Sequence, residues 1–134
     1  PERPDYQAVI LAAADPANPY GAALPWPART DTDASHRPGR KAGALVVLVD
    51  GELVWFLERG GRSLLNFTAD AEAQRAAAGA LAGLVSDGRV GGILIERLDG
   101  APVLEAAAHE GRRVTADALV DAGFARTPRG LRLR

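Results

Sequence analysis

Few residues of this chain have the types and spacing that a self-contained active site requires. Lys41, the only lysine, precedes an apolar run and not a helix, so a glycine-rich ATP-binding loop is not expected. Cysteine is absent, and neither His36 nor His109 belongs to a cluster with metal-ligand spacing. No Gly-x-Ser-x-Gly segment marks a hydrolase nucleophile. We therefore expect no metal site and no cofactor within these 134 residues.

Asp15 is the single candidate for a catalytic residue. It follows the apolar run Val9–Ala12, which we expect to be a buried strand, and catalytic carboxylates often lie at strand ends. The alternative is structural, because an aspartate before Pro16 commonly accepts a backbone hydrogen bond in an Asx turn. The local pattern favours the turn.

Basic side chains gather in two places and are the candidates for nucleic-acid binding. The first group precedes the apolar run that begins at Ala42, and the second lies near residue 134. We predict phosphate contacts, with salt-dependent binding, for Arg37, Arg40, Lys41, Arg129, Arg132 and Arg134. For the first group the alternatives are a solvated loop or salt bridges to Asp31, Asp33 or the acidic turn residues. For Arg132 and Arg134 the alternative is a charged strand edge that blocks aggregation. A net charge of −1 excludes a basic field over the whole domain.

A long loop is expected over residues 15–39, where prolines are frequent. Long loops in compact domains tend to be functional or interfacial. Tyr20, Leu24 and Trp26 within it are the predicted interface residues, although Trp26 fits a local core equally well. Trp55, by contrast, lies inside an apolar hairpin, so packing is favoured there over stacking on a nucleobase.

Residues 42–67 predict a three-stranded antiparallel meander. Asp50-Gly51 and Gly60-Gly61 are dipeptides that tolerate positive φ, as type I′ hairpin turns require. Folding about them pairs Val49 with Glu52, Val46 with Trp55 and Leu57 with Leu64. Both faces of this sheet are apolar, so we expect it to be covered on both sides or curled into a barrel.

The remaining elements predict an α+β fold: a barrel-like antiparallel meander with two helices packed on it and terminal β-hairpins. One helix should begin at the N-cap Thr68 and end near Gly88, and the other should begin at the N-cap Thr115 and end at Gly123. A hairpin is expected over 92–105, with Asp99-Gly100 at its tip and Pro102 on an edge strand. A turn over 127–130 then leads into a last strand.

One domain of 134 residues accommodates all of these elements. Residues 1–14 would hold the first strand, 15–39 the proline-rich loop, and 40–134 the sheet and helices. The chain starts at Pro1 and contains no methionine, so we expect it to be a piece of a longer protein. It shows no signal peptide and no apolar run of membrane length, from which we expect a cytoplasmic location without membrane contact.

Several segments together resemble the C-terminal end of the bacterial large helicase-related (Lhr) proteins, a branch of superfamily 2 DNA helicases. The resemblance spans nearly the whole chain and is carried, in order, by Leu11–Pro27, Arg37–Ala44, the meander with Gly60-Gly61-Arg62, and Thr127–Arg132. It implies a longer chain that couples ATP hydrolysis to translocation along single-stranded DNA. ATP and Mg²⁺ would be bound upstream, in a helicase core that is absent from these residues.

The resemblance implies a non-catalytic accessory domain. Its expected partners are the rest of the helicase chain and DNA. Because the apolar sheet and the Tyr20 loop need cover, we also predict assembly, with homo-oligomerisation through the C-terminal region. A nucleic-acid-binding module is the first alternative. A DNA-glycosylase-like repair module is the second, since the C-terminal region of that family resembles glycosylases built from tandem winged helices and a barrel-like unit. On that view Val9–Leu11 leads out of a winged-helix module, and the glycosylase Gln-x-Asp motif is not found.

Overall fold

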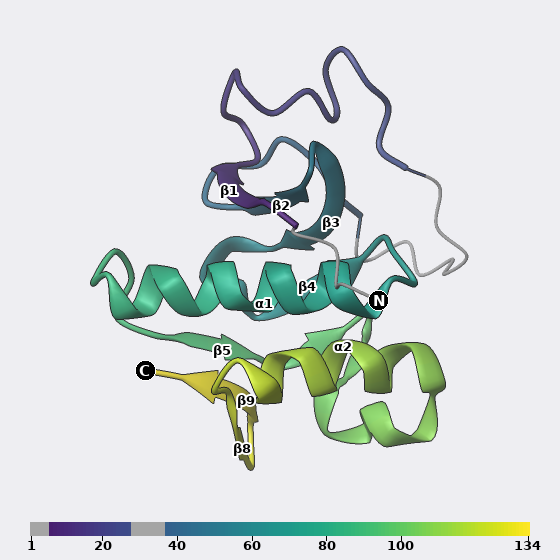
Figure 1. Ribbon diagram of the computed structural model, residues 1–134, viewed down its shortest axis with the longest axis vertical. Helices are drawn as coiled ribbons and strands as arrows, with labels where there is room; N and C mark the ends of the chain where they lie inside the picture. Colours follow the sequence, from purple (N-terminus) through teal and green to yellow (C-terminus); the bar gives the residue numbers. More distant parts are fainter. Residues whose placement is uncertain (1–5, 28–36) are drawn as a thin grey trace.

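The computed structural model describes residues 6–27 and 37–134, which form two sheets, two α-helices and two short 3₁₀ turns (Figure 1). The larger sheet has six strands in the order β1-β2-β3-β4-β6-β7. These are β1 (Ala8–Ala12), β2 (Leu45–Val49), β3 (Glu52–Leu57), β4 (Ser63–Asn66), β6 (Arg97–Leu98) and β7 (Ala101–Pro102). Neighbouring strands are antiparallel except β4 and β6, which pair in parallel. The α+β prediction is confirmed, but the sheet does not close into a barrel within the described residues.

A second sheet contains three strands, with β9 (Gly130–Leu133) between β5 (Ile93–Ile95) and β8 (Ala125–Thr127). Only Glu96 separates β5 from β6, so the chain passes from one sheet to the other at this residue. The expected hairpin over 92–105 is therefore wrong in extent. Only β6 and β7 form a hairpin, and β5 pairs with the distant β9.

The meander over β2, β3 and β4 has the predicted order but a different register in one place. Asp50 and Gly51 have φ values of 51° and 84°, as a type I′ turn requires, and Val49 pairs with Glu52. A bulge between Val47 and Leu48 then shifts the pairing by one residue, so Trp55 faces Val47 and the predicted Val46–Trp55 pair is wrong. A bulge of this kind transfers the side chains beyond it to the opposite face, and no sequence signal marks it.

The connection from β3 to β4 is longer than the two-residue turn predicted at Gly60-Gly61. A short 3₁₀ turn, η1 (Arg59–Gly61), forms there, and the Gly61 N–H donates to the Glu58 carbonyl at 2.8 Å. Both glycines have positive φ, which is the property that the prediction used. The predicted pairing of Leu57 with Leu64 is confirmed.

Helix α1 (Ala71–Ser86) begins two residues later than predicted. Its N-cap is Asp70, whose Oδ1 accepts hydrogen bonds from the N–H groups of Glu72 and Ala73 at 2.9 and 3.3 Å. The predicted cap, Thr68, instead accepts a bond from the Asp70 N–H at 3.0 Å. The helix ends at the C-cap Asp87, before Gly88 with φ 74°, as expected.

Helix α2 (Glu110–Asp121) begins five residues before the predicted N-cap, after the 3₁₀ segment η2 (Val103–Ala108). Thr115 is therefore buried in the middle of the helix, where its hydroxyl donates to the Gln74 side chain of α1. The expected end is confirmed, because Phe124 is buried and its N–H donates to the Leu119 carbonyl at 3.0 Å. Helix α2 packs chiefly on α1 and η2, and its buried residues Ala116 and Leu119 belong to the same hydrophobic core as the sheet.

Both faces of the meander are covered, as predicted, but by elements of this chain. Helix α1 lies across one face, where Ala77 and Leu81 pack with Val47 and Trp55 (Figure 1). On the opposite face, Tyr20 and Trp26 from the loop after β1 pack with Val46, Leu48, Leu53, Phe56 and Leu65. Burial of apolar side chains on both faces supplies the main free energy that holds these layers together.

Strand β1 is an edge strand and is only partly buried, so the expectation of a buried strand is wrong. The Val9 side chain is 51% exposed. Strand β7 forms the opposite edge and contains Pro102, as predicted. Among the described residues, no helix is long and apolar enough to cross a membrane.

Candidate nucleic-acid interface

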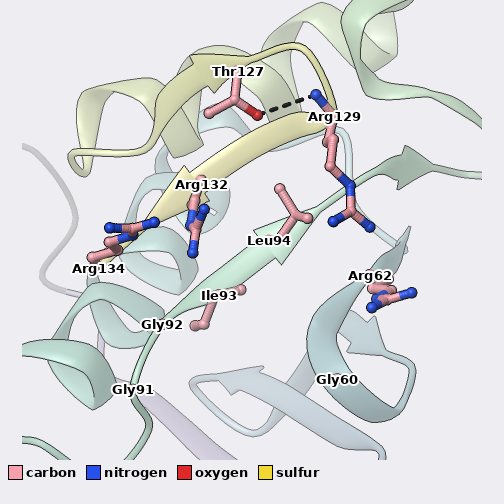
Figure 2. A pocket seen from close by; sticks show the side chains of 10 residues that line it. All are labelled: Gly60, Arg62, Gly91, Gly92, Ile93, Leu94, Thr127, Arg129, Arg132 and Arg134. Carbon is pink, nitrogen blue, oxygen red and sulfur yellow. Dashed lines mark hydrogen bonds between the residues drawn. The ribbon is translucent and has the colours of Figure 1, made fainter.

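Four arginines line an open groove of about 360 Å³ between the two sheets (Figure 2). Arg132 and Arg134 extend from β9, and Arg129 comes from the turn that precedes it. Figure 2 shows Arg62 on the other side of the groove, beyond Leu94. The remaining lining residues are Gly60, Gly91, Gly92, Ile93 and Thr127.

The side-chain alternation of a β-strand places two of these arginines on one face. Leu131 and Leu133 point into the main hydrophobic core, so Arg132 and Arg134 point to the opposite face, into the groove. Strand β9 is the central strand of its sheet, pairing with β5 and β8. The alternative that these arginines guard an exposed sheet edge is therefore wrong. Arg126, one strand away, lines a separate small pocket beside Leu131.

Backbone contacts fix the turn that carries Arg129. The Thr127 hydroxyl accepts hydrogen bonds from the N–H groups of Arg129 and Gly130, each at 3.2 Å. Gly130 lies close to the segment at Ile95-Glu96 where the chain passes from one sheet to the other. A Cβ atom added to Gly130 would be 2.2 Å from the Ile95 carbonyl oxygen. The glycine thus allows β9 to approach the chain between β5 and β6 directly.

The acidic side chain of Glu96 lies near two of the four groove arginines and, within the described part of the chain, leaves the other two unpaired. The Glu96 Oε1 atom lies 3.6 Å from Arg62 Nε and 3.5 Å from Arg129 Nη2. No ion pair or hydrogen bond of the Arg132 or Arg134 side chain is found within residues 6–27 and 37–134. The groove therefore has a partly neutralised part, where one carboxylate faces both Arg62 and Arg129, and a part with free positive charge, at Arg132 and Arg134.

The chemistry of the lining suits an anion bound through its oxygens. Guanidinium groups donate in a planar fork that matches phosphate and carboxylate oxygens. Leu94 pairs with Arg132 across the strands, so it offers apolar surface to the aliphatic part of that side chain. None of the lining residues is aromatic, so the groove lacks a platform on which a nucleobase could stack.

The basic residues of the first predicted group do not line this groove. Arg40 is engaged with the loop, since its guanidinium donates to the carbonyls of Asn18, Tyr20 and Asp15 at 2.9 to 3.0 Å. Lys41 forms a salt bridge with Glu58 at 2.9 Å, as the salt-bridge alternative expects of an acidic residue near a turn, whereas Asp31 and Asp33 lie outside the described residues. Arg37 is exposed, and its carbonyl accepts a bond from Lys41.

Asp15 adopts the turn geometry that its sequence context favours. Its Oδ1 atom accepts a hydrogen bond from the Ala17 N–H at 2.8 Å, which is an Asx turn. Among the described residues, no group of three or more His, Cys, Asp or Glu side chains could hold a metal ion.

The three predicted interface residues separate into packed and exposed positions. The Tyr20 ring stacks on Trp26 at 6.4 Å, and Trp26 meets Phe56 edge-on at 5.7 Å. The Tyr20 hydroxyl also accepts a bond from the Leu53 N–H at 3.2 Å. Leu24, 44% exposed, leaves the most apolar surface accessible, whereas Trp26 is partly buried and Tyr20 is buried.

Sequence reasoning missed Arg62 and Glu96. The Arg62 carbonyl accepts hydrogen bonds from the N–H groups of Glu96 and Arg97 at 2.8 and 3.0 Å, next to the parallel pairing of β4 with β6. This pairing joins segments more than 30 residues apart without a turn signal between them. The sequence predicted only a turn at Gly60-Gly61, directly before Arg62.

Comparisons with known proteins place the chain within a larger one. No family model matches it. It is 69% identical over all 134 residues to Lhr helicase/probable uracil glycosylase of Mycolicibacterium smegmatis, of which the match covers 9%. It is also 48% identical over 60 residues, 45% of the chain and 4% of the relative, to Lhr helicase/uracil glycosylase of Escherichia coli strain K12. The chain thus spans less than a tenth of either relative's length, and over its whole length it is similar to the C-terminal region of an Lhr protein.

Proposed function

We propose that this domain is a non-catalytic accessory part of an ATP-dependent helicase chain and contacts nucleic acid through the arginine groove. One observation carries the proposal: Arg132 and Arg134 share a concave face and have no acidic partner among the described residues. Unpaired guanidinium groups in a groove attract phosphates, and the resulting contacts release counterions from the nucleic acid. ATP and Mg²⁺ would act elsewhere in the longer chain, whose remaining part is the first partner of this domain.

Charge neutralisation of the free arginines tests this function. The variant Arg132→Gln/Arg134→Gln should bind a fluorescein-labelled dT20 oligonucleotide more weakly in anisotropy titrations at several salt concentrations. Losing two phosphate contacts should also reduce the slope of log K against log salt by about 1.4, at roughly 0.7 per contact on a single strand. Arg37→Gln would test the exposed member of the first basic group in the same way.

Arg75→Gln is the matched control, because Arg75 is exposed on α1, outside the groove, and pairs with Asp121 at 3.5 Å. It removes one positive charge without touching the proposed site. Equal affinity and equal salt slope for the unaltered chain, Arg75→Gln and the double variant would overturn the proposal.

Assembly is the second proposed function, and the edge strand β1 supports it. The strand contains no charged residue that would protect an edge, and its Val9 side chain is 51% exposed. Leu24 adds exposed apolar surface from the following loop, whereas Tyr20 and Trp26 are already packed within the domain. We propose that a second copy of the chain pairs with this edge.

Sedimentation velocity over a range of concentrations tests the assembly. The unaltered chain should associate, and Val9→Lys should remain monomeric, because a lysine on the edge disfavours strand pairing. Val120→Lys is the control, since Val120 is exposed on α2 and is 39% accessible. A monomer at all concentrations for the unaltered chain rules out this proposal.

A glycosylase-like role is suggested by the names of both relatives, which include uracil glycosylase. Asp15 is the only catalytic candidate of this chain, and its carboxylate serves an Asx turn. We therefore expect Asp15→Asn in the longer chain to release uracil from DNA at the unaltered rate, because asparagine preserves the turn. Loss of release in a folded Asp15→Asn protein would instead identify Asp15 as catalytic.

A further inference from the structure

We propose that Glu96 is an internal competitor for phosphate, so that the groove receives a single nucleic-acid strand in two stages. Successive phosphates of the strand first occupy Arg132 and Arg134. Further phosphates then displace the Glu96 carboxylate from Arg62 and Arg129. The inference rests on the proposed nucleic-acid contact and adds to it a ligand class and a means of control.

The backbone of Glu96 is held while its side chain can leave. Its N–H donates to the Arg62 carbonyl at 2.8 Å, and its carbonyl accepts from the Val103 N–H at 2.8 Å. Both backbone groups are thereby fixed at the crossing between the two sheets. The side chain is still 31% exposed, so its rotation toward solvent requires no movement of a strand.

The carboxylate is held loosely in its present position. Its Oε1 atom is buried yet makes no hydrogen bond, and it lies 3.5 to 3.6 Å from the two guanidinium groups. Hydrogen-bonded arginine–carboxylate pairs are closer, at about 2.7 to 2.9 Å. An anion that met Arg62 and Arg129 with proper hydrogen-bond geometry would therefore replace the carboxylate favourably.

The lining indicates a strand that is held by its backbone and not by its bases. Arg132 and Arg134 are two residues apart on one strand face, so their Cα atoms are separated by about 6.7 Å. This repeat is comparable to the spacing of successive phosphates along an extended single strand. The absence of aromatic side chains from the lining excludes base stacking there. Binding should consequently be independent of sequence.

Glu96→Gln tests the competition, because glutamine keeps the shape and removes the charge. In the 134-residue chain it should bind dT20 about five- to tenfold more tightly at 0.1 M salt. The salt slope should change little, because phosphates contact Arg62 and Arg129 in both complexes and the variant removes only the competing carboxylate. Binding of dT20 and of a mixed-sequence 20-mer should be strengthened to the same degree.

Two controls separate this effect from a general change of charge. Glu72→Gln removes an acid of similar exposure, 37%, that faces Arg75 at 4.0 Å outside the groove, and it should leave binding unchanged. Glu96→Asp keeps the charge and should bind no more tightly than the unaltered chain. Urea unfolding of each variant establishes that all are folded, and Glu96→Ala replaces Glu96→Gln should the latter not fold.

The outcomes distinguish this inference from the proposed function. Unchanged affinity in Glu96→Gln, with weakened binding in Arg132→Gln/Arg134→Gln, overturns the competition and leaves the nucleic-acid contact standing. Unchanged affinity in the arginine double variant overturns the nucleic-acid contact and the competition with it. Tighter binding in Glu96→Gln together with weaker binding in the double variant supports both.

Discussion

Gly130 shows how a single residue without a side chain determines the position of the groove. Its φ of 151° and the 2.2 Å approach of a Cβ to the Ile95 carbonyl oxygen leave no space for alanine. The atom in the way belongs to the backbone of the sheet crossing and cannot rotate aside. Gly130 therefore keeps β9, with its arginines, against the segment that carries Glu96.

Gly130→Ala should lower the free energy of unfolding by about 3 kcal/mol, combining backbone strain with a forced displacement of β9. The measurement is the urea unfolding midpoint. Gly51→Ala is the matched control, because Gly51 also has positive φ, 84°, but has no atom within 4 Å of the added Cβ. It should cost only about 1 kcal/mol. Equal costs for the two variants would refute the clash.

Tyr6 and Asp70 form a titratable contact between the segment before β1 and the start of α1. The Tyr6 hydroxyl donates to Asp70 Oδ2. This hydrogen bond is the main cause that lowers the pKa of Asp70 from its ordinary 3.8, and two backbone N–H bonds act in the same direction. The same bond is the main cause that raises the pKa of Tyr6 from 10.0. The contact is thus strongest with an ionised aspartate and a neutral tyrosine.

These shifts predict a stability contribution that is limited at both ends of the pH range. Because the pKa of Asp70 is lowered in the folded protein, the ionised carboxylate stabilises the fold above pH 3.8. This stabilisation is lost as the pH falls through the pKa that Asp70 has in the folded protein. Because the pKa of Tyr6 is raised in the folded protein, the neutral hydroxyl stabilises the fold below pH 10.0. This stabilisation is lost as the pH rises through the pKa that Tyr6 has in the folded protein. Tyr6→Phe should accordingly lower the unfolding midpoint near pH 7 and match the unaltered chain at both extremes. A difference that does not vary with pH would contradict this assignment.

Helices α1 and α2 are joined by a buried polar contact, in which the Thr115 hydroxyl donates to the Gln74 side chain. Thr115→Val preserves the shape but leaves the Gln74 Oε1 atom without this donor in a buried position. We expect a loss of about 1 to 3 kcal/mol in the free energy of unfolding, measured by thermal or urea denaturation. Thr115→Ser keeps the hydroxyl and should cost about 1 kcal/mol or less for one methyl group. A larger loss for Thr115→Ser than for Thr115→Val would show that packing dominates here.

The secondary-structure elements themselves were predictable where a local signal sets them. Asp50-Gly51 and Asp99-Gly100 both have positive φ at each residue and form the predicted tight turns. The predictions of strand register and of helix boundaries failed where contacts between distant parts of the chain determine them. Trp55, which lies beyond the bulge at Val47/Leu48, and Thr115, which lies inside the early-starting α2, are both buried, and burial outweighs local capping preference.

Over the whole molecule, Arg40 joins the segment before β2 to the segment after β1. Its guanidinium donates to three loop carbonyls, of Asp15, Asn18 and Tyr20. Arg40→Ala should lower the free energy of unfolding by about 2 kcal/mol, the usual loss for hydrogen bonds to a charged group. The loop should also become more sensitive to limited proteolysis. Arg37→Ala, an exposed neighbour, should stay within about 0.5 kcal/mol, and an equal effect of both variants would count against this role.

The amino-acid sequence by itself determined the α+β class, the order of the meander, both Asp-Gly turns and the relation to Lhr proteins, because turn chemistry, apolar alternation and motifs are local. It also singled out Arg129, Arg132 and Arg134 as candidates for phosphate contact. Only the tertiary structure decided that these meet Arg62 and Glu96, that Arg40 supports a loop, and that the loop covers the second face of the sheet. The physical reason is that these contacts join segments far apart in the chain. Such contacts follow from burial of the whole core, which no local pattern encodes.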